Sequence, residues 1–201
     1  MRSNVLNYMN HLVLADLSDE ELASLVSSQN EAYDILMERY EIKLMRYIRR
    51  LSVLNQQEVE DILQDVFLKA YMYINDFDKS LKFSSWIYRI THNAVISEHR
   101  KWAKYAYEPI DQDAENIIQL IDDIDFGYDF DRKILRDIMQ KGIASIPLKE
   151  REAIQLYYME GFCMQEISDI LKKPIGSIAT LIRRGKQRLK KFIDRNFPSK
   201  S

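Results

Sequence analysis

Apolar residues recur along most of this chain at intervals of three and four positions, the spacing of one face of an α-helix. One such stripe consists of Val59, Ile62, Leu63, Val66, Phe67, Ala70, Tyr71 and Ile74. A second precedes it and consists of Ile35, Leu36, Tyr40, Leu44, Tyr47, Ile48 and Leu51. No segment sustains the alternation of apolar and polar residues that is typical of a half-buried strand. The pattern therefore predicts an all-α fold.

Capping residues and helical spacing predict where the other helices lie. They are expected over residues 84–103, 132–144, 149–159, 165–171 and 177–195. A shorter helix should begin near Ser18, because Ser18 and Glu21 match the capping box of a serine and a glutamate three residues later. Ser84 or Ser85 is predicted to cap the 84–103 helix, and Ser177 the last one. Only five Gly and four Pro occur in 201 residues, which also favours helices.

The formal net charge of −2 conceals an uneven distribution. Residues 1–104 carry 13 basic and 15 acidic side chains, and residues 105–137 carry 3 and 10. Residues 138–201 carry 13 and 6, a net of +7. Taken whole, the charge argues against a nucleic-acid-binding protein, whereas its distribution indicates separate partners for separate parts of the chain.

The segment 105–131 breaks the helical pattern and is rich in acidic residues, and it also holds Pro109 and Gly127. It is predicted to be an acidic linker between two small helical domains, 18–104 and 132–201, with 1–17 as an N-terminal extension. Ile117, Ile118, Leu120, Ile121 and Ile124 lie among the acidic residues of the linker. They indicate either a part that docks on a partner or a short helix packed on the same protein.

Several classes of protein are disfavoured by what the chain lacks. Its one cysteine, Cys163, permits no intramolecular disulfide, which favours a reducing, cytoplasmic location, and it is interpreted as a small core residue. No run of about 18 apolar residues is present, so membrane insertion is not expected. The common nucleotide-binding and hydrolase motifs are absent, and His92 and His99 have no evident third metal ligand. The sequence predicts a non-catalytic protein without a cofactor or a metal.

The last two helices have the pattern of a helix-turn-helix unit. Ile167, Ile170 and Leu171 form a short apolar face, and Pro174 interrupts the helix because it disfavours helical geometry at the preceding residue. The stripe of the next helix is Ile178, Ile182, Gly185 and Leu189. Its other faces carry Arg183, Arg184, Lys186, Arg188, Lys190 and Lys191. A basic second helix of this kind lies in the major groove of duplex DNA, although a solvated charged face is the simpler alternative.

Two further surfaces are predicted. Asp61, Asp65, Leu68 and Met72 share the face opposite the 59–74 stripe, with Gln64 beside them, which favours a docking surface over singly exposed apolar residues. Between residues 77 and 104, aromatic residues alternate with basic ones, a composition suited to single-stranded DNA. Most aromatics at helical spacing are core residues, however, and at least partial burial is expected for two of them, Trp86 and Tyr88.

The order of these features over roughly residues 18–195 resembles the bacterial RNA polymerase sigma factors, specifically the compact extracytoplasmic-function group. Residues 61–68 (DILQDVFL) are similar to the family segment that docks on the clamp helices of the largest polymerase subunit. Residues 83–93 (FSSWIYRITHN) are similar to the segment that opens and reads the minus-ten promoter element. Residues 145–152 and 161–189 are similar to the domain that reads the minus-thirty-five element.

The resemblance implies three sets of site residues. The polymerase-binding set is Asp61, Gln64, Asp65, Leu68 and Met72. The minus-ten set is Asp78, Lys79, Lys82, Phe83, Trp86, Tyr88, Arg89, Asn93, Ser97, Arg100 and Lys101. The minus-thirty-five set is Ser177, Ala179, Thr180, Arg183, Arg184 and Lys186. The chain departs from the family at Ser97, where Asp is common, and at Ala179 and Leu181, where Lys and Arg are common.

By this resemblance the chain is expected to be a non-catalytic promoter-specificity subunit that needs no cofactor. Its implied partners are core RNA polymerase, promoter DNA in duplex and melted form, and an anti-sigma factor, all encountered in the cytoplasm. The alternative is a stand-alone helix-turn-helix regulator with an N-terminal dimerisation or ligand-binding domain, which would bind duplex DNA without the polymerase.

Overall fold

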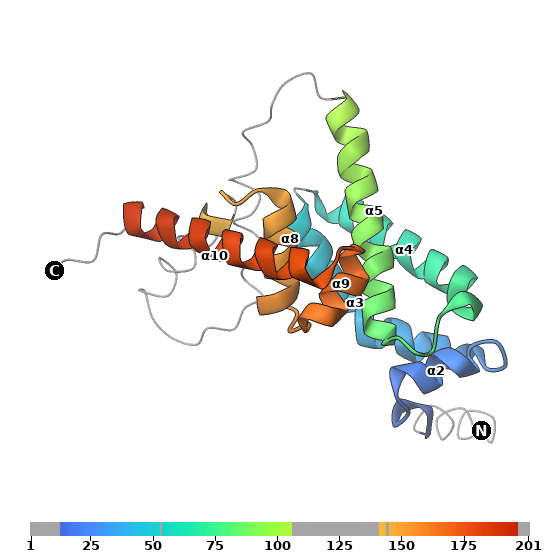
Figure 1. Ribbon diagram of the computed structural model, residues 1–201. Helices are drawn as coiled ribbons and strands as arrows, with labels where there is room; N and C mark the ends of the chain where they lie inside the picture. The colour runs from blue at the N-terminus through green and yellow to red at the C-terminus, as the bar shows by residue number, and fades with distance from the viewer. Residues whose placement is uncertain (1–12, 53, 106–140, 144, 197–201) are drawn as a thin grey trace, which may run out of the picture. The chain divides into compact units, whose positions relative to one another are not determined.

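The computed structural model describes residues 13–52, 54–105, 141–143 and 145–196. Every regular element within these ranges is a helix, which confirms the all-α prediction (Figure 1). Residues 1–12, the predicted linker beyond Tyr105 and nearly all of the predicted 132–144 helix lie outside the described residues. No helix in the described ranges is long and apolar enough to cross a membrane.

The chain separates into two compact units. The first comprises Met1–Ile48 and Asn55–Glu98, and the second comprises Arg49–Leu54 and His99–Ser201. The helices that begin in the first unit are α2 (Asp19–Leu25), α3 (Asn30–Leu51), α4 (Gln56–Tyr73), the short 3₁₀ helix η1 (Ile74–Asp76) and α5 (Phe83–Tyr105). Those of the second unit are α8 (Leu148–Tyr158), α9 (Met164–Leu171) and α10 (Ile175–Asn196).

The two long stripes form most of the core of the first unit, with one correction. All seven members of the α3 stripe are buried, as are Val59, Ile62, Leu63, Val66 and Ala70 of α4. Tyr71 is 47% exposed, and Phe67 is only half-buried. These two residues lie about 120° and 80° around α4 from Val59, at the edge of the buried arc. Tyr71 rests edge-on against the ring of Tyr33, at a centroid distance of 5.1 Å, and its other side faces solvent.

The helix starts confirm one predicted cap and overturn two. Ser18 caps α2 in the predicted capping box with Glu21. The α5 helix begins at Phe83, so Ser84 and Ser85 lie in its first turn, and the Phe83 amide donates instead to Glu20. Ser177 is not a cap either, because α10 begins at Ile175 and the Ser177 amide donates to the Pro174 carbonyl. Proline presets the backbone angle that a helix start needs.

The second unit is built on a close crossing of α10 over α8. Ile178 and Ile182 of α10 are buried, and Gly185 faces Ile154 of α8. A Cβ atom at Gly185 would lie 2.4 Å from Cδ1 of Ile154, well inside van der Waals contact. The two helices therefore cross closely at Gly185, and any larger residue there would have to displace the Ile154 side chain.

The α8 helix also buries charged residues, among them Glu150 and Glu152. Glu150 pairs with Arg188 of α10 at 2.9 Å. Burial raises the pKa of Glu152 from an ordinary value of 4.5 to about 7, although Lys173, Lys149 and Arg151 oppose the shift. Keeping Glu152 ionised in the folded unit therefore costs free energy.

Glu152→Gln is expected to stabilise the second unit at pH 8 by about 3 kcal/mol, the free energy that corresponds to the rise of the pKa from 4.5 to about 7. Between pH 4.5 and 7 the folded state binds more protons at Glu152 than the unfolded state does, so stability falls as the pH rises through this window. The gain should therefore vanish near pH 4. Hydrogen-exchange protection of the α8 amides in the intact chain measures it, with the exposed Asp194→Asn as the control. An equal gain at both pH values would contradict the explanation.

Candidate functional site

The polymerase-binding set forms one continuous face of α4. Asp61, Gln64, Asp65, Leu68 and Met72 are all exposed. They lie opposite the buried stripe, because steps of about 100° per residue carry them to the far side of the helix. Leu68 is 60% exposed and Met72 is 62% exposed. Two large apolar side chains open to solvent on the same face as two carboxylates have the character of a protein-docking surface.

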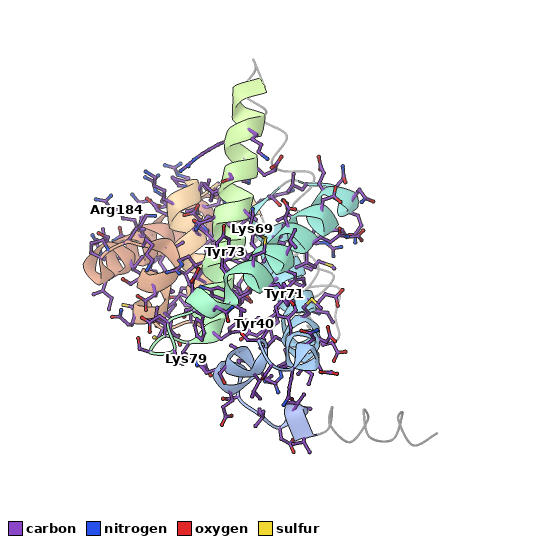
Figure 2. The ribbon with its side chains drawn as sticks, turned by 90° about the vertical axis from the view of Figure 1, so that its right-hand side faces the viewer. Tyr40, Lys69, Tyr71, Tyr73, Lys79 and Arg184 are labelled. Atoms are coloured by element: carbon purple, nitrogen blue, oxygen red, sulfur yellow. The ribbon has the colours of Figure 1, made fainter. Side chains whose placement is uncertain are left out.

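Two tyrosines that sequence reasoning did not place here add to the exposed apolar surface of α4. Tyr71 and Tyr73 are 47% and 52% exposed. Figure 2 shows Tyr73 with Lys69 along one side of α4 and Tyr71 on the side toward Tyr40 of α3. The signal available in the sequence was the position of Tyr71 at the edge of the stripe. Tyrosine is enriched in protein interfaces because it combines a large apolar ring with a polar tip.

Three aromatic residues of the minus-ten set are core residues in this structure. Phe83, Trp86 and Tyr88 are 2%, 6% and 3% exposed. The rings of Phe83 and Trp86 lie 5.5 Å apart, and each lies within 5.7 Å of Phe77. Tyr88 packs against Tyr47 at 5.0 Å. Burial of Trp86 and Tyr88 agrees with the sequence-based expectation for these two residues.

The remaining members of the minus-ten set lie on the loop before α5 and on one side of α5. Asp78, Lys79 and Lys82 are exposed on the loop, where Figure 2 labels Lys79. Asn93, Ser97, Arg100 and Lys101 are exposed on α5, and Arg89 is half-buried. Trp86 lies on the same side of α5 as Asn93, two turns earlier, but Phe77 packs against it. The face is therefore available only beyond the second turn of α5.

The helix-turn-helix unit has the predicted form. Ile167, Ile170 and Leu171 bury the inner face of α9. The helix ends at Lys172, whose φ of 51° reverses the chain, and the Ser168 hydroxyl donates to the Lys173 carbonyl at 2.6 Å. Pro174 then leads directly into α10. The turn between the helices is thus closed locally.

The minus-thirty-five set lies on the outer side of α10. Arg183, Arg184, Lys186 and Ser177 are exposed, and Ala179 and Thr180 are half-buried. The Thr180 hydroxyl donates to the carbonyl of Gly176 in its own helix. Arg188, which the sequence grouped with the free cations of α10, is held by Glu150. Lys186 lies over the ring of Tyr158, at 6.0 Å from its centroid, so α8 adds an exposed tyrosine to this basic surface.

The structure gives Cys163, His92 and His99 different surroundings. Cys163 is exposed at the start of α9, which corrects its interpretation as a core residue. The loop turns its side chain outward there, while the Cys163 amide donates to Glu166 at 2.7 Å. His92 lies 3.2 Å from the Tyr47 hydroxyl, and His99 lies 2.9 Å from the Leu51 carbonyl. Within the described ranges, no three His, Cys, Asp or Glu side chains are grouped to hold a metal ion.

Two family models match this chain, one in its N-terminal part and one in its C-terminal part. Residues 36–104, which include α4 and α5, match Sigma-70 region 2. Residues 136–189, which include α8, α9 and most of α10, match Sigma-70, region 4. The two matches appear in the order that the sequence motifs indicate.

Characterised relatives and solved structures agree with these matches. The chain is 31% identical over 166 residues to the ECF RNA polymerase sigma factor SigW of Bacillus subtilis, covering 80% of this chain and 88% of the relative. It is 25% identical to the ECF RNA polymerase sigma-E factor of Escherichia coli, covering 85% and 92%. In fold it is similar to CnrH, solved in complex with the cytosolic domain of CnrY, with a TM-score of 0.65, 21% identity and coverage of 88% and 97%. A second similar structure is the sigma factor RpoE of Bartonella quintana with the anti-sigma factor NepR, with a TM-score of 0.57, 21% identity and coverage of 79% and 96%.

Proposed function

Because this chain belongs to the extracytoplasmic-function group of RNA polymerase sigma factors, we propose that separate surfaces of its two regions divide the work of promoter recognition. As a sigma factor it is a promoter-specificity subunit, which binds core RNA polymerase and directs transcription initiation. The proposal assigns the polymerase contact to α4, the minus-ten element to the loop before α5 and the exposed side of α5, and the minus-thirty-five element to α10.

The observation that carries the proposal is the exposed face of α4. Leu68 and Met72 are open to solvent on the same face as Asp61 and Asp65, although the opposite side of the helix is buried in the core. Two exposed apolar side chains that share one face favour a docking surface, and burying them against a partner helix is favourable. The clamp helices of the largest polymerase subunit are the proposed partner.

The minus-ten contact is assigned to exposed groups only. Lys79 and Lys82 on the loop, with Asn93 on α5, offer cations and an amide to phosphates and unstacked bases. The buried ring cluster of Phe77, Phe83 and Trp86 supports this surface from below. Extruding a base costs a few kcal/mol of stacking free energy, so the loop must be held in place before the base arrives.

Loss of the two outer arginines of α10 is expected to weaken promoter binding. In the reconstituted holoenzyme, Arg183→Ala with Arg184→Ala should lower affinity for a promoter duplex about tenfold or more and relax base preference in the upstream element. The salt dependence of binding should also become shallower. Arg195→Ala, an exposed arginine in the last turn of α10, is the matched control. Equal losses in the two variants would speak against a specific contact.

The remaining proposals follow from the family. The chain works in the cytoplasm without catalysis or a cofactor of its own. An anti-sigma factor is proposed as a further partner, supported by the two similar structures, whose sigma chains were solved with CnrY and with NepR. Such a partner would compete with the polymerase for the exposed face of α4.

Transcription with purified components tests the function directly. Core RNA polymerase from the source organism is incubated with fragments of its genomic DNA, with and without the chain, and the 5′ ends of the transcripts are sequenced. The expected result is a set of start sites that depend on the chain and share one pair of upstream elements. Sequence-specific duplex binding without core, combined with no new start sites, would instead favour the stand-alone regulator.

A further inference from the structure

Both ends of the loop between η1 and α5 are hydrogen-bonded to α2 or its C-terminal edge. At the far end, the Phe83 amide donates to Oε1 of Glu20 at 2.8 Å, across 63 positions of sequence. At the near end, the Ser27 hydroxyl donates to Oδ1 of Asn75 at 2.6 Å, across 48 positions. The segment from 76 to 82 is therefore held at both roots by one short stretch of chain.

The α2 helix is itself anchored to α3. Asp19 accepts from Arg39 at 2.6 Å and also from the Tyr40 hydroxyl. Arg39 donates further to the carbonyls of Ala15 and Leu17, at 2.6 and 2.9 Å. Burial, followed by the hydrogen bond to Asp19, raises the pKa of Tyr40, so this hydroxyl remains a donor. These contacts with α3 fix the position of Asp19, and therefore also that of its neighbour Glu20.

The ring cluster reinforces the far end of the loop. Phe83 packs against Tyr40 at 5.5 Å, and Phe77 packs against Phe83 at 5.7 Å. Phe77, at the start of the loop, and Phe83, the first residue of α5, are thus in contact beneath it. Glu20 accepts a hydrogen bond from the backbone amide of Phe83, and the ring of Phe83 packs against both Tyr40 and Phe77. The hydrogen bond and the ring packing therefore hold the same residue in place.

The loop between these roots is ordered by its own hydrogen bonds. The Ser80 amide donates to Oδ1 of Asp78 at 2.9 Å, and the Leu81 amide donates to the Asp78 carbonyl at 2.9 Å. Hydrogen bonds from Ser80 hold the pKa of Asp78 below its usual range. Lys79 and Ser80 are left exposed at the tip of this turn. A compact turn on two fixed roots presents its tip in one orientation.

We propose that α2 is a two-point clamp, in which Glu20 and Ser27 set the orientation of the 76–82 loop and so determine how strictly the minus-ten element is read. Glu20 and Ser27 are positioning residues, because they act through Phe83 and Asn75 and need not contact DNA. The proposal rests on the assignment of the loop to the minus-ten element. Holding the loop before DNA binds reduces the ordering cost at the moment of base capture.

The test uses the full chain assembled with core polymerase and a promoter library randomised across the minus-ten element. Enrichment of the preferred bases is compared between wild type, Glu20→Ala, Glu20→Gln and Ser27→Ala. Glu20→Ala should lower the enrichment about tenfold, the effect of losing one charge-assisted hydrogen bond that fixes the loop. Glu20→Gln retains an acceptor for the Phe83 amide and should stay near wild type. Glu31→Ala and Ser28→Ala, exposed neighbours of the same residue types, are the matched controls.

A second readout reports on the loop roots without DNA. In a Trp102→Phe background, Trp86 is the remaining tryptophan, and its ring lies within the cluster beside Phe77 and Phe83. Glu20→Ala should increase quenching of Trp86 by acrylamide about twofold, through local opening, while thermal unfolding and core affinity stay close to wild type. Glu20→Gln should not increase it.

The outcomes separate this proposal from the function on which it rests. If Lys79→Ala alters base preference but Glu20→Ala and Ser27→Ala do not, the clamp is wrong and the loop assignment stands. If Lys79→Ala also leaves the preference unchanged, the loop assignment itself is wrong. Equal losses in Glu20→Gln and Glu20→Ala would overturn the role of the hydrogen bond.

Discussion

Replacing Gly185 with leucine is expected to separate α10 from α8 and to abolish recognition of the upstream promoter element. A Cβ atom at this position would lie 2.4 Å from Cδ1 and 3.1 Å from Cγ1 of Ile154, and 3.5 Å from Cβ of Glu150. Leucine adds three further carbons in a space that Ile154 already fills, and such overpacking costs about 3 kcal/mol or more. The higher helix propensity of leucine offsets only about 1 kcal/mol of this cost.

The measurement compares the intact variant with wild type in two ways. Hydrogen-exchange protection should fall throughout α8, α9 and α10, and specific affinity of the holoenzyme for promoter duplex should fall to the level of non-specific DNA. Core binding through α4 should persist. Gly185→Ala tests the cause, because its single methyl group meets only Ile154, and Ile154→Ala in the same chain should relieve part of the loss. An unchanged exchange pattern in Gly185→Leu would refute the packing argument.

Loss of core polymerase binding is expected when Asp65→Lys is combined with Leu68→Ala. Leu68 is 60% exposed and Asp65 lies one turn away on the same face, so the variant removes an apolar contact and reverses a charge. Truncated interface anchors commonly cost 2 kcal/mol or more, and a reversed charge adds repulsion to a basic partner. We expect core affinity to fall about 100-fold to 1,000-fold, with chain-dependent transcription lost in parallel.

The control variant carries the same two kinds of substitution on α3 instead of α4. Ile42 is also 60% exposed, and Asp34 is an exposed carboxylate, so Asp34→Lys with Ile42→Ala reproduces the same two substitutions elsewhere. Fluorescence anisotropy with labelled chain and purified core measures both pairs. Because α4 buries Val66 and Leu63 on its other side, neither substitution on the exposed face should lower the unfolding temperature appreciably. Similar affinities for the two double variants would contradict the docking assignment.

The surface of α4 could be predicted from the sequence because both its faces belong to one regular helix. Once the buried residues of the helix are identified, the rotation of about 100° per residue tells which residues lie on the opposite, exposed face. The error at Tyr71 has the same origin. Helical spacing alone does not tell how wide the buried face of α4 is. The width of the surface on α3 that covers it decides which residues at its edge are exposed.

The helix-turn-helix unit could also be predicted, since its signals are local. Pro174 stops and restarts the helix within a few residues, and the stripe on α10 defines its outer cations. Sequence reasoning did not reveal that Arg188 is paired with Glu150 or that Gly185 sits at a helix crossing, because both depend on α8, about 30 residues earlier.

The sequence by itself determined the all-α class, most helix positions, the helix-turn-helix unit and the exposed side of α4, because each depends on spacing within a single segment. Only the tertiary structure decided that Phe83 is buried, that Cys163 is exposed, and that Glu20 takes the place of a serine cap at α5. These features arise where segments distant in sequence meet. Helical periodicity carries no information about which segments pack together. At such positions the burial of a residue depends on the other segment that covers it.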